Sequence, residues 1–224
     1  LWNPRFGVDH TIGANLDRLL DFYGGSSCTL VLRRPTAPAN YVLYTASRQK
    51  PGHSAIPNEI TERAAGALLQ LPDTFSAAYR APAGSWWRKQ RGYLAYDFDI
   101  RARTDAFREE CAAVANLLDT RAFITVPYVQ HEGGKGRIYL TFDDGRFDQS
   151  DIEFLAQASH AMSTVVENMN LMEELVAQAT GDERRKISRD LHDTTIQPYI
   201  GLKIALEALQ REAGADHRLA QRIS

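Results

Sequence analysis

The hydrophobic and polar positions of this 224-residue chain change period several times, and each change predicts a secondary-structure element. Apolar residues at helical spacing follow Thr11 and stop at Gly24-Gly25, which predicts a helix with a threonine cap and a glycine end. Two β-rich runs, 28–34 and 41–48, flank the Pro-rich stretch PTAPAN and predict adjacent antiparallel strands. The chain therefore opens with a helix followed by a strand pair.

The middle of the chain combines two predicted helices, one clear hairpin and one stretch of weak periodicity. We expect a helix from Asn58 to about Leu71, and another that is capped by Thr104. Residues 73–103 are rich in aromatic and basic side chains and predict only a strand among loops. AFITVPYVQ and GRIYLTF, joined by HEGGKG, predict a β-hairpin because a glycine-rich turn separates two strand-forming runs. The buried face of the second helix is expected to hold Phe107, Cys111, Val114 and Leu118.

A long helix is predicted after the hairpin. Asp148 is a suitable N-cap with Asp151 three residues later, and Phe147 is placed to pack on Ile152. Apolar residues then recur in alternating steps of three and four at Leu155, Ala158, Met162, Val165, Met169, Met172 and Val176. We interpret the methionines as packing residues rather than a cofactor site, and a seam of this length favours a parallel dimer.

The seam does not continue in register beyond Val176. The apolar positions resume at Ile187, Leu191 and Thr194, which predicts a stutter around Thr180, Gly181 and Asp182. Two interpretations are open. The stutter is either a joint that relays a signal, or a change from two-stranded to four-stranded helix packing.

Composition narrows the class of protein. A formal net charge of −2 gives no reason to expect nucleic acid or an anionic membrane as the main partner. Cys28 and Cys111 lack metal-type spacing and lie in apolar runs, so we expect reduced core residues, no metal site and a cytoplasmic location. No apolar run reaches the length of a membrane span. The first residue is not Met and the last lies in a helical pattern, so we expect a piece of a longer protein.

The sequence RRKISRDLHDTTIQPYIGLKIALEAL, residues 184–209, carries the clearest candidate chemistry. Its apolar residues are numerous enough to face a helical bundle. An imidazole such as that of His192 can accept a phosphoryl group while a carboxylate, here Asp193, fixes its tautomer. Gln197 lies one turn beyond Asp193, where its amide can orient a water molecule. The other histidines have no such company and are interpreted as structural or surface residues: His10, His53, His131, His160 and His217.

The run ERRKISRDLHDTTIQ, residues 183–197, resembles the phosphoacceptor box of sensor histidine kinases of the nitrate-sensor and DesK-like class. The resemblance implies that His192 accepts the γ-phosphoryl group of ATP, that Asp193 is its acid-base partner, and that Gln197 positions the hydrolytic water when a response regulator is dephosphorylated. It also implies ATP with Mg in the full-length protein, a homodimer through the long helix and bundle, and a response regulator of the LuxR/NarL type. The basic run Arg184, Arg185, Lys186 and Arg189 is either a contact for such a regulator or ATP, or a solvated face.

Residues from about 11 to 170 resemble a GAF domain in the order of their predicted elements. The expected fold is therefore α+β, with a GAF-type antiparallel sheet flanked by helices, then a long coiled-coil helix leading into a truncated helical-hairpin dimerisation bundle. The expected divisions are a GAF-like sensory domain (1–150), a signalling coiled-coil helix (151–183) and a phosphoacceptor dimerisation domain (184–224). The expected function is the sensory and phosphoacceptor part of a two-component sensor histidine kinase. The alternative is a non-catalytic, ligand-gated GAF dimerisation or relay module.

Two departures from the family pattern qualify these expectations. Pro198 removes a helical hydrogen bond and predicts a kink just past His192, as a switch or as a tolerated packing feature. No ATP-binding segment follows, so this chain alone is not expected to bind ATP. The GAF ligand is unknown, because the aromatic residues that could line a pocket suit a core equally: Trp86, Trp87, Tyr93, Tyr96 and Phe98. A ligand-free relay and membrane attachment of the parent protein both stay open.

Overall fold

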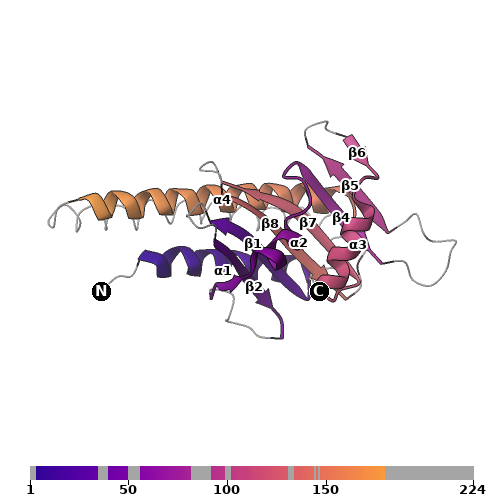
Figure 1. Ribbon diagram of the computed structural model, residues 1–224, viewed down its shortest axis with the longest axis horizontal. Coiled ribbons are helices and arrows are strands. Elements are labelled where there is room, and N and C mark those ends of the chain that lie inside the picture. Colours follow the sequence, from indigo (N-terminus) through magenta and orange to yellow (C-terminus); the bar gives the residue numbers. More distant parts are fainter. Residues whose placement is uncertain are drawn as a thin grey trace, which may run out of the picture.

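The computed structural model describes residues 4–34, 40–49, 56–81, 92–98, 102–130, 134–143, 145 and 147–179. Within these residues the chain forms four helices and eight strands (Figure 1). The helices are α1 (Pro4–Tyr23), α2 (Glu62–Leu68), α3 (Arg108–Leu117) and α4 (Gln149–Gln178). The strands are β1 (Ser27–Arg34), β2 (Asn40–Ser47), β3 (Asn58–Ile60), β4 (Phe75–Arg80), β5 (Tyr93–Asp97), β6 (Ala102–Thr104), β7 (Ala122–Val129) and β8 (Lys135–Phe142).

All eight strands join one sheet in the order β3-β2-β1-β8-β7-β4-β5-β6, and every neighbouring pair is antiparallel. The predicted strand pair is confirmed as β1 and β2, and the predicted hairpin as β7 and β8. Pro127 lies inside β7, which has a neighbour on each side. Its position fits the rule that proline avoids fully paired strands, because the pairing of β4 to β7 stops at Thr125.

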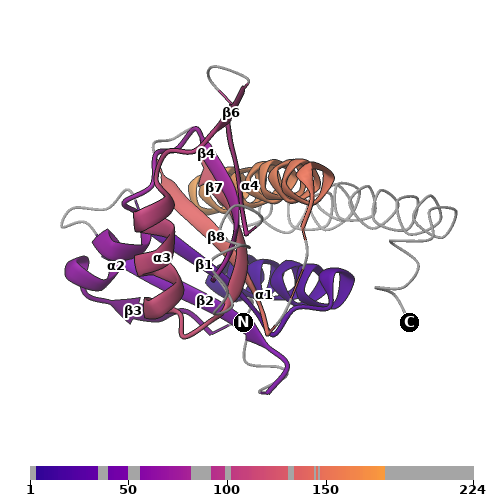
Figure 2. The same cartoon turned by 90° about the vertical axis from the view of Figure 1, so that its right-hand side faces the viewer.

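Helices cover both faces of the sheet. Figures 1 and 2 show α1 and α4 together on one face, and α2 and α3 on the other. The first face packs a mainly aliphatic core against α1 and α4, with Ile12, Leu16, Leu30, Ile138 and Leu155 among its fully buried members. The second face packs a more aromatic core under α2 and α3, centred on Phe75, Phe123 and Tyr139. The α+β class and the antiparallel sheet flanked by helices are thus as predicted.

Helix α1 ends where the sequence predicts but begins earlier. Gly24 adopts φ 66°, the left-handed conformation that favours glycine, and the amide of Gly25 donates to the carbonyl of Leu20. The prediction that Thr11 caps the start is wrong, because the helix begins at Pro4. Thr11 lies inside the helix, where its hydroxyl donates to the carbonyl of Gly7 at 2.8 Å.

The two short helices of the second face also differ from prediction at their starts. Residues Asn58–Ile60 form β3 rather than the start of a helix, and Thr61 then caps α2 by accepting from the amide of Ala64. Thr104 ends β6 and does not cap α3, whose N-cap position is held by Phe107 with φ 60°. The predicted buried face of α3 is confirmed, with Cys111 and Val114 buried and Phe107 and Leu118 packed against the same core. Both helices start later than predicted, because each is preceded by a short edge strand that the periodicity did not reveal.

Helix α4 begins as predicted. Asp148 accepts from the amide of Asp151, and the Asp151 carboxylate accepts from the amide of Asp148, which completes a capping box. Phe147 packs on Phe142, with ring centroids 4.6 Å apart. The helix ends at Gln178, and Ala179 is extended with φ −74° and ψ 147°. The predicted stutter around Thr180, Gly181 and Asp182 lies outside the described residues and stays a prediction. No helix in the described part of the chain has the length and apolarity needed to cross a membrane.

Candidate functional site

The residues with the predicted phosphotransfer chemistry follow α4 in the chain. His192, Asp193 and Gln197 all lie outside the described residues, as do Pro198 and the basic run that precedes the histidine. The division of the chain at residues 150 and 183 also stays a prediction. The structure describes the elements that precede this segment in the chain, including the sheet, the helix pair α1 and α4, and the contacts between them.

Helices α1 and α4 lie side by side and run antiparallel (Figure 1). At the end of α1 the Tyr23 hydroxyl donates to the carbonyl of Asp151 at 2.7 Å, and the rings of Phe22 and Phe154 are 4.8 Å apart. Near the start of α1, Gly7 lies against the Met169 side chain, which a Cβ at this glycine would meet at 3.4 Å. The contacts place residue 7 beside residue 169 and residue 22 beside residue 154, so the last turns of α4 extend beyond the start of α1.

The predicted heptad seam of α4 changes its partner along the helix. Its first four residues are buried within their own domain, with exposed fractions of 5% or less: Leu155, Ala158, Met162 and Val165. The first three of them pack in the core between the helix pair and the sheet, so the first half of the seam is not a dimer contact. Met169, Met172 and Val176 are partly exposed. The interpretation of the whole seam as a dimer interface is therefore wrong for its first half.

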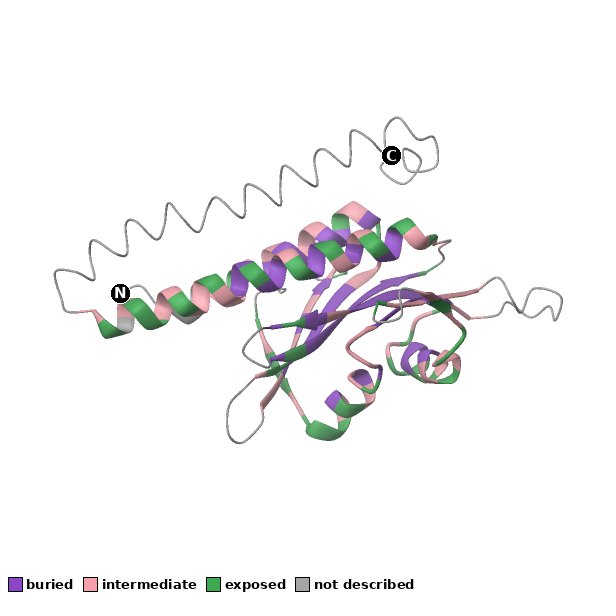
Figure 3. Cartoon of the chain, turned by 90° about the horizontal axis from the view of Figure 1, so that it is seen from above, coloured by how far each residue is buried: buried purple, intermediate pink, exposed green. Residues whose placement is uncertain are grey.

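A second stripe on α4 faces solvent (Figure 3). Its residues also recur in steps of three and four, and all are exposed: Glu153, Gln157, His160, Thr164, Asn168, Leu171 and Leu175. The first five are polar, whereas Leu171 and Leu175 are leucines with 48% and 57% of their surface exposed. Only the last two turns of the helix therefore present leucine to solvent.

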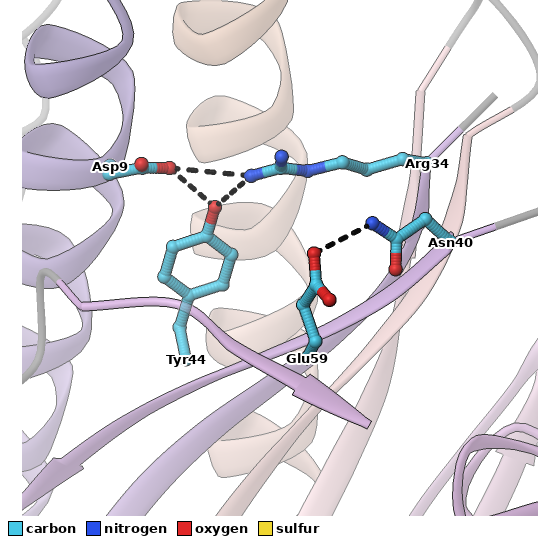
Figure 4. Close-up of polar contacts among 5 residues, drawn as sticks. All are labelled: Asp9, Arg34, Asn40, Tyr44 and Glu59. Atoms are coloured by element: carbon cyan, nitrogen blue, oxygen red, sulfur yellow. Dashed lines mark hydrogen bonds and ion pairs between the residues drawn. The ribbon is translucent and has the colours of Figure 1, made fainter. Parts of the chain in front are cut away.

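A polar cluster joins α1 to the sheet (Figure 4). The hydroxyl of Tyr44 on β2 donates to Oδ1 of Asp9 on α1 at 2.6 Å, and the Arg34 guanidinium at the end of β1 donates to the same hydroxyl at 2.9 Å. Arg34 also lies 3.5 Å from the Asp9 carboxylate. Burial and the Asp9 carboxylate together raise the pKa of Tyr44 to about 12, despite the opposing effect of Arg34. Figure 4 also shows the amide of Asn40 donating to Glu59, which ties β2 to β3.

A second buried tyrosine lies on the same face of the sheet. Tyr128 on β7 is fully buried, with the Gln130 side chain beside its hydroxyl and no hydrogen bond from that hydroxyl to α1 or α4. Burial raises its pKa, and the nearby Glu167 carboxylate of α4 adds to the increase. The two tyrosines therefore differ, because the hydroxyl that faces α1 is bonded to a carboxylate and the other is not.

The opposite face of the sheet holds a buried cation. Arg137 on β8 has 1% of its surface exposed and donates to the carbonyls of Leu71, Pro72 and Phe75 and to the Thr125 hydroxyl. Burial lowers its pKa. Tyr139 on the same strand donates to the carbonyl of Leu68, the last residue of α2. These two side chains fasten the end of α2 and the following turn to the sheet.

The aromatic residues and cysteines of this face pack together. Tyr79 stacks on Phe123 with centroids 5.5 Å apart, and Phe123 contacts Tyr139 edge to face. Tyr93 packs against the same core, whereas Tyr96 and Phe98 contact each other near the edge of the sheet; Trp86 and Trp87 lie outside the described residues. Both cysteines are free and fully buried, and burial raises the pKa of each thiol, as expected for core residues.

The described residues offer little to a cofactor. A shallow hollow of about 400 Å³ lies at the end of α3, lined by Ala115, Asn116, Asp119, Thr120, Arg121, Phe142 and Asp143. Asp143 already accepts from the hydroxyl of Ser26 at 2.9 Å, and the Thr120 hydroxyl bonds backbone carbonyls. No group of three metal-ligating side chains occurs in the part of the chain that the structure describes. His10 and His160 are exposed, while His53, His131 and His217 lie outside that part.

Sequence reasoning missed the Asp9–Arg34–Tyr44 cluster and the buried Arg137. Both involve an arginine on a β-strand, Arg34 on β1 and Arg137 on β8. The alternation of side chains along a strand is the one sequence signal that could have indicated which face each arginine occupies. Arg137 sits in the run GRIYLTF, between two residues that point to the opposite face, so its position predicts an inward side chain. Asp9 gave no signal because the helix was expected to start after it.

The family described as "Histidine kinase" matches residues 183–224. The match contains the whole His192-Asp193 motif and confirms the resemblance to histidine kinases that the motif indicates. None of the curated proteins matches the chain.

Several solved GAF-domain structures are similar to the described part of the chain. The phycocyanobilin-bound GAF domain from a cyanobacterial phytochrome is 9% identical, with 73% of this chain and 86% of that chain covered and a TM-score of 0.48. The phycoerythrobilin-bound GAF domain from a cyanobacterial phytochrome is 9% identical, with 75% and 88% covered and a TM-score of 0.49. A domain assigned to a two-component sensor histidine kinase of Sinorhizobium meliloti 1021 is 12% identical, with 76% and 91% covered and a TM-score of 0.44.

Proposed function

We propose that this chain is the sensory and phosphoacceptor part of a two-component sensor histidine kinase. The observation that carries the proposal is the family match over residues 183–224, which begins five residues after the end of α4 at Gln178 and includes His192, Asp193 and Gln197. In this proposal the α+β domain is a GAF-type sensor, and α4 connects it to the phosphoacceptor segment.

The proposed reaction is phosphoryl transfer from ATP to His192. A ring nitrogen of His192 attacks the γ-phosphorus, the bond from phosphorus to the bridging oxygen breaks, and ADP leaves with the electron pair. Asp193 holds the other ring nitrogen and accepts the proton that the imidazole gives up. The phosphoryl group then passes to an aspartate of a response regulator of the LuxR/NarL type. In the opposing phosphatase reaction, Gln197 orients the water that hydrolyses the phosphorylated regulator. ATP and Mg are bound by a domain of the full-length protein.

A homodimer is part of the proposal, because the phosphoacceptor segment has a broad apolar face suited to a helical bundle. The structure supports a specific site for the contact along α4. The exposed stripe is polar from Glu153 to Asn168 and becomes apolar at Leu171 and Leu175, next to the partly exposed Met172 and Val176. We therefore propose that the dimer contact starts at Leu171, five residues past the buried Val166 of α4.

The test uses the full chain mixed with the ATP-binding domain of its own parent protein and γ-labelled ATP. We expect acid-labile, base-stable label in the unsubstituted protein and none in His192→Ala. His160→Ala is the matched control, because His160 is an exposed histidine on α4 outside the motif, and it should keep full labelling. Label that persists in His192→Ala would contradict the assignment of the phosphoacceptor.

Two other functions give different results in the same experiment. A non-catalytic GAF relay, the alternative that the sequence leaves open, would give no label in folded protein that binds ATP through the added domain. A protein in which phosphatase activity predominates would release phosphate from a phosphorylated response regulator. Gln197→Ala would abolish that release, whereas His192→Ala would partly spare it.

A further inference from the structure

The contact between Tyr44, Asp9 and Arg34 joins one fully buried side chain to two charged side chains that are partly exposed. The Tyr44 side chain is fully buried between the sheet and α1, but the Asp9 and Arg34 side chains keep 23% and 35% of their surface exposed. The tyrosine therefore stays in the core while water can reach both charged groups. Such a contact can open by exchange of the carboxylate for water, without unpacking the core.

The contact is also placed where the helix pair loses the support of the sheet. Gly7 lies beside Met169, so Asp9 lies close to the level of Glu167 on the antiparallel α4. Val166 is the last buried residue of α4, and the residues after it are partly or fully exposed. Asp9 and Tyr44 therefore hold α1 to the sheet at the level where α4 emerges from the domain.

The neighbouring Tyr128 does not hold α4 to the sheet in the way that Tyr44 holds α1. Its hydroxyl is buried beside the Gln130 side chain and makes no hydrogen bond to α4, although the Glu167 carboxylate on that helix is close enough to raise its pKa. At this level the sheet therefore holds α1 by the hydrogen bond from Tyr44 to Asp9, whereas Tyr128 donates no hydrogen bond to α4. The helix that leads to His192 thus depends on α1 for part of its position.

We propose that Asp9, Arg34 and Tyr44 form a latch that holds the first turns of α1 to the sheet, and that opening the latch releases the exposed half of α4 and changes the phosphorylation of His192. The regulatory part of this statement rests on the proposed function, whereas the structural part does not. A hydrogen bond between a hydroxyl and a carboxylate changes an opening equilibrium by about tenfold or more. That range suits a conformational equilibrium in which both states are populated.

Hydrogen exchange of the full chain tests the structural part. Tyr44→Phe removes one hydroxyl without changing the core volume, and Asp9→Asn removes the charge of its acceptor. We expect the amides of the first half of α1, and those of α4 after Val166, to exchange about tenfold faster in both variants. The double variant should match the single ones, since all act on one contact.

Two matched controls separate the latch from a general loss of stability. Tyr139→Phe also removes one buried hydroxyl that donates to a backbone carbonyl, but on the opposite face of the sheet, and it should leave the exchange of α1 and α4 unchanged. Tyr128→Phe removes a buried hydroxyl that is bonded to neither helix, and it should not accelerate exchange in α1 or α4. Unchanged exchange of α1 in Tyr44→Phe, or equal acceleration in Tyr139→Phe, would overturn the latch.

The labelling assay with γ-labelled ATP tests the regulatory part. We expect Tyr44→Phe and Asp9→Asn to change the label on His192 at least threefold, in the same direction, while Tyr139→Phe does not. Faster exchange with unchanged labelling would overturn the regulatory part alone. If the unsubstituted protein takes no label, the proposed function fails with the regulatory part, and the exchange data still decide whether the latch holds α1.

Discussion

The two faces of the sheet are covered by helices of very different length, and they are held in different ways. On one face, α1 and α4 have 20 and 30 residues and bury a continuous, mainly aliphatic core. On the other, α2 has only seven residues, of which Ala65 and Leu68 are buried, and α3 has ten. Arg137 and Tyr139 fasten the end of α2 by hydrogen bonds to backbone carbonyls. A short helix buries too little surface to hold itself in place, so directed polar contacts make up the difference.

The difference implies that the two faces respond to different substitutions. Apolar truncation should be most costly on the long-helix face, where each side chain contributes to one tightly packed core. Loss of a polar donor should be most evident on the short-helix face, where a few bonds fix a whole segment. The following predictions test this division.

The largest expected effect is that of Leu155→Ala on α4. Leu155 is fully buried in the aliphatic core, so we expect the free energy of unfolding to fall by about 4 kcal/mol. Leu68→Ala on α2 is the matched control, because Leu68 is also buried but keeps 6% of its surface exposed on a short helix that can relax. There we expect about 2 kcal/mol. Urea denaturation followed by circular dichroism measures both, and an equal or larger loss for Leu68→Ala would break the comparison.

The next effect concerns the polar contacts of the short-helix face. Arg137→Lys keeps the positive charge but replaces a planar fork with a single donor atom, so it cannot bond all of its carbonyl partners. We expect a loss of about 2 kcal/mol in the free energy of unfolding and faster hydrogen exchange in α2. Arg103→Lys is the control, because Arg103 donates to Gln149 at the exposed surface and should lose less than about 0.5 kcal/mol. Faster exchange in α1 or α4 instead would contradict the division between the faces.

The same division explains what the sequence could predict. The long helices carry explicit end signals in the sequence, so the end of α1 at Gly24 and the capping box of Asp148 and Asp151 were predicted correctly, although the start of α1 was not. The edge strands β3 and β6, which precede the short helices α2 and α3, have three residues each. These are too few for alternation to be recognised, and both strands were missed. Periodicity also cannot name the partner of an apolar stripe. Leu155 and Met162 therefore fitted a dimer seam as well as the domain core that they occupy.

The residues with candidate phosphotransfer chemistry were easier to find in the sequence than the latch. His192, Asp193 and Gln197 were identified by residue type and spacing, and the family match supports their setting in a histidine kinase segment. The Asp9–Arg34–Tyr44 latch was not identified, because its members come from one helix and two strands and are joined only in the folded chain. Motifs of residues that are close together in the chain are visible in a sequence, whereas contacts between distant elements depend on the register of the sheet.

A third prediction confines dimerisation to the long-helix face. Leu175→Glu places a charge on the exposed leucine pair of α4, and we expect the dissociation constant of the dimer to rise at least tenfold, about 1.4 kcal/mol. Leu117→Glu is the matched control, since Leu117 is a similarly exposed leucine on α3 at 52%. It should leave the dimer unchanged. Analytical ultracentrifugation of the full chain measures both, and a weaker dimer in Leu117→Glu would place the contact on the wrong face.

The smallest expected effect is the alkaline response of the latch on the long-helix face. The pKa of Tyr44 is raised to about 12, above the value of about 10 for a tyrosine in an unfolded chain. The folded state therefore binds more protons than the unfolded state between these values, and the free energy of unfolding must fall as the pH rises through that window. From pH 9 to pH 11 we expect Tyr44 to account for a loss of about 1 kcal/mol.

Comparison with Tyr44→Phe isolates this contribution. The other buried tyrosines and the two cysteines titrate in both proteins, so their effects cancel when the two slopes are subtracted. The variant should start from a lower stability at pH 9, because it lacks the bond to Asp9, and should then lose stability less steeply as the pH rises. Parallel curves would show that the Tyr44 hydroxyl is no more buried or bonded in the folded protein than in the unfolded chain. The contact between this part of α1 and the sheet would then depend on apolar packing alone.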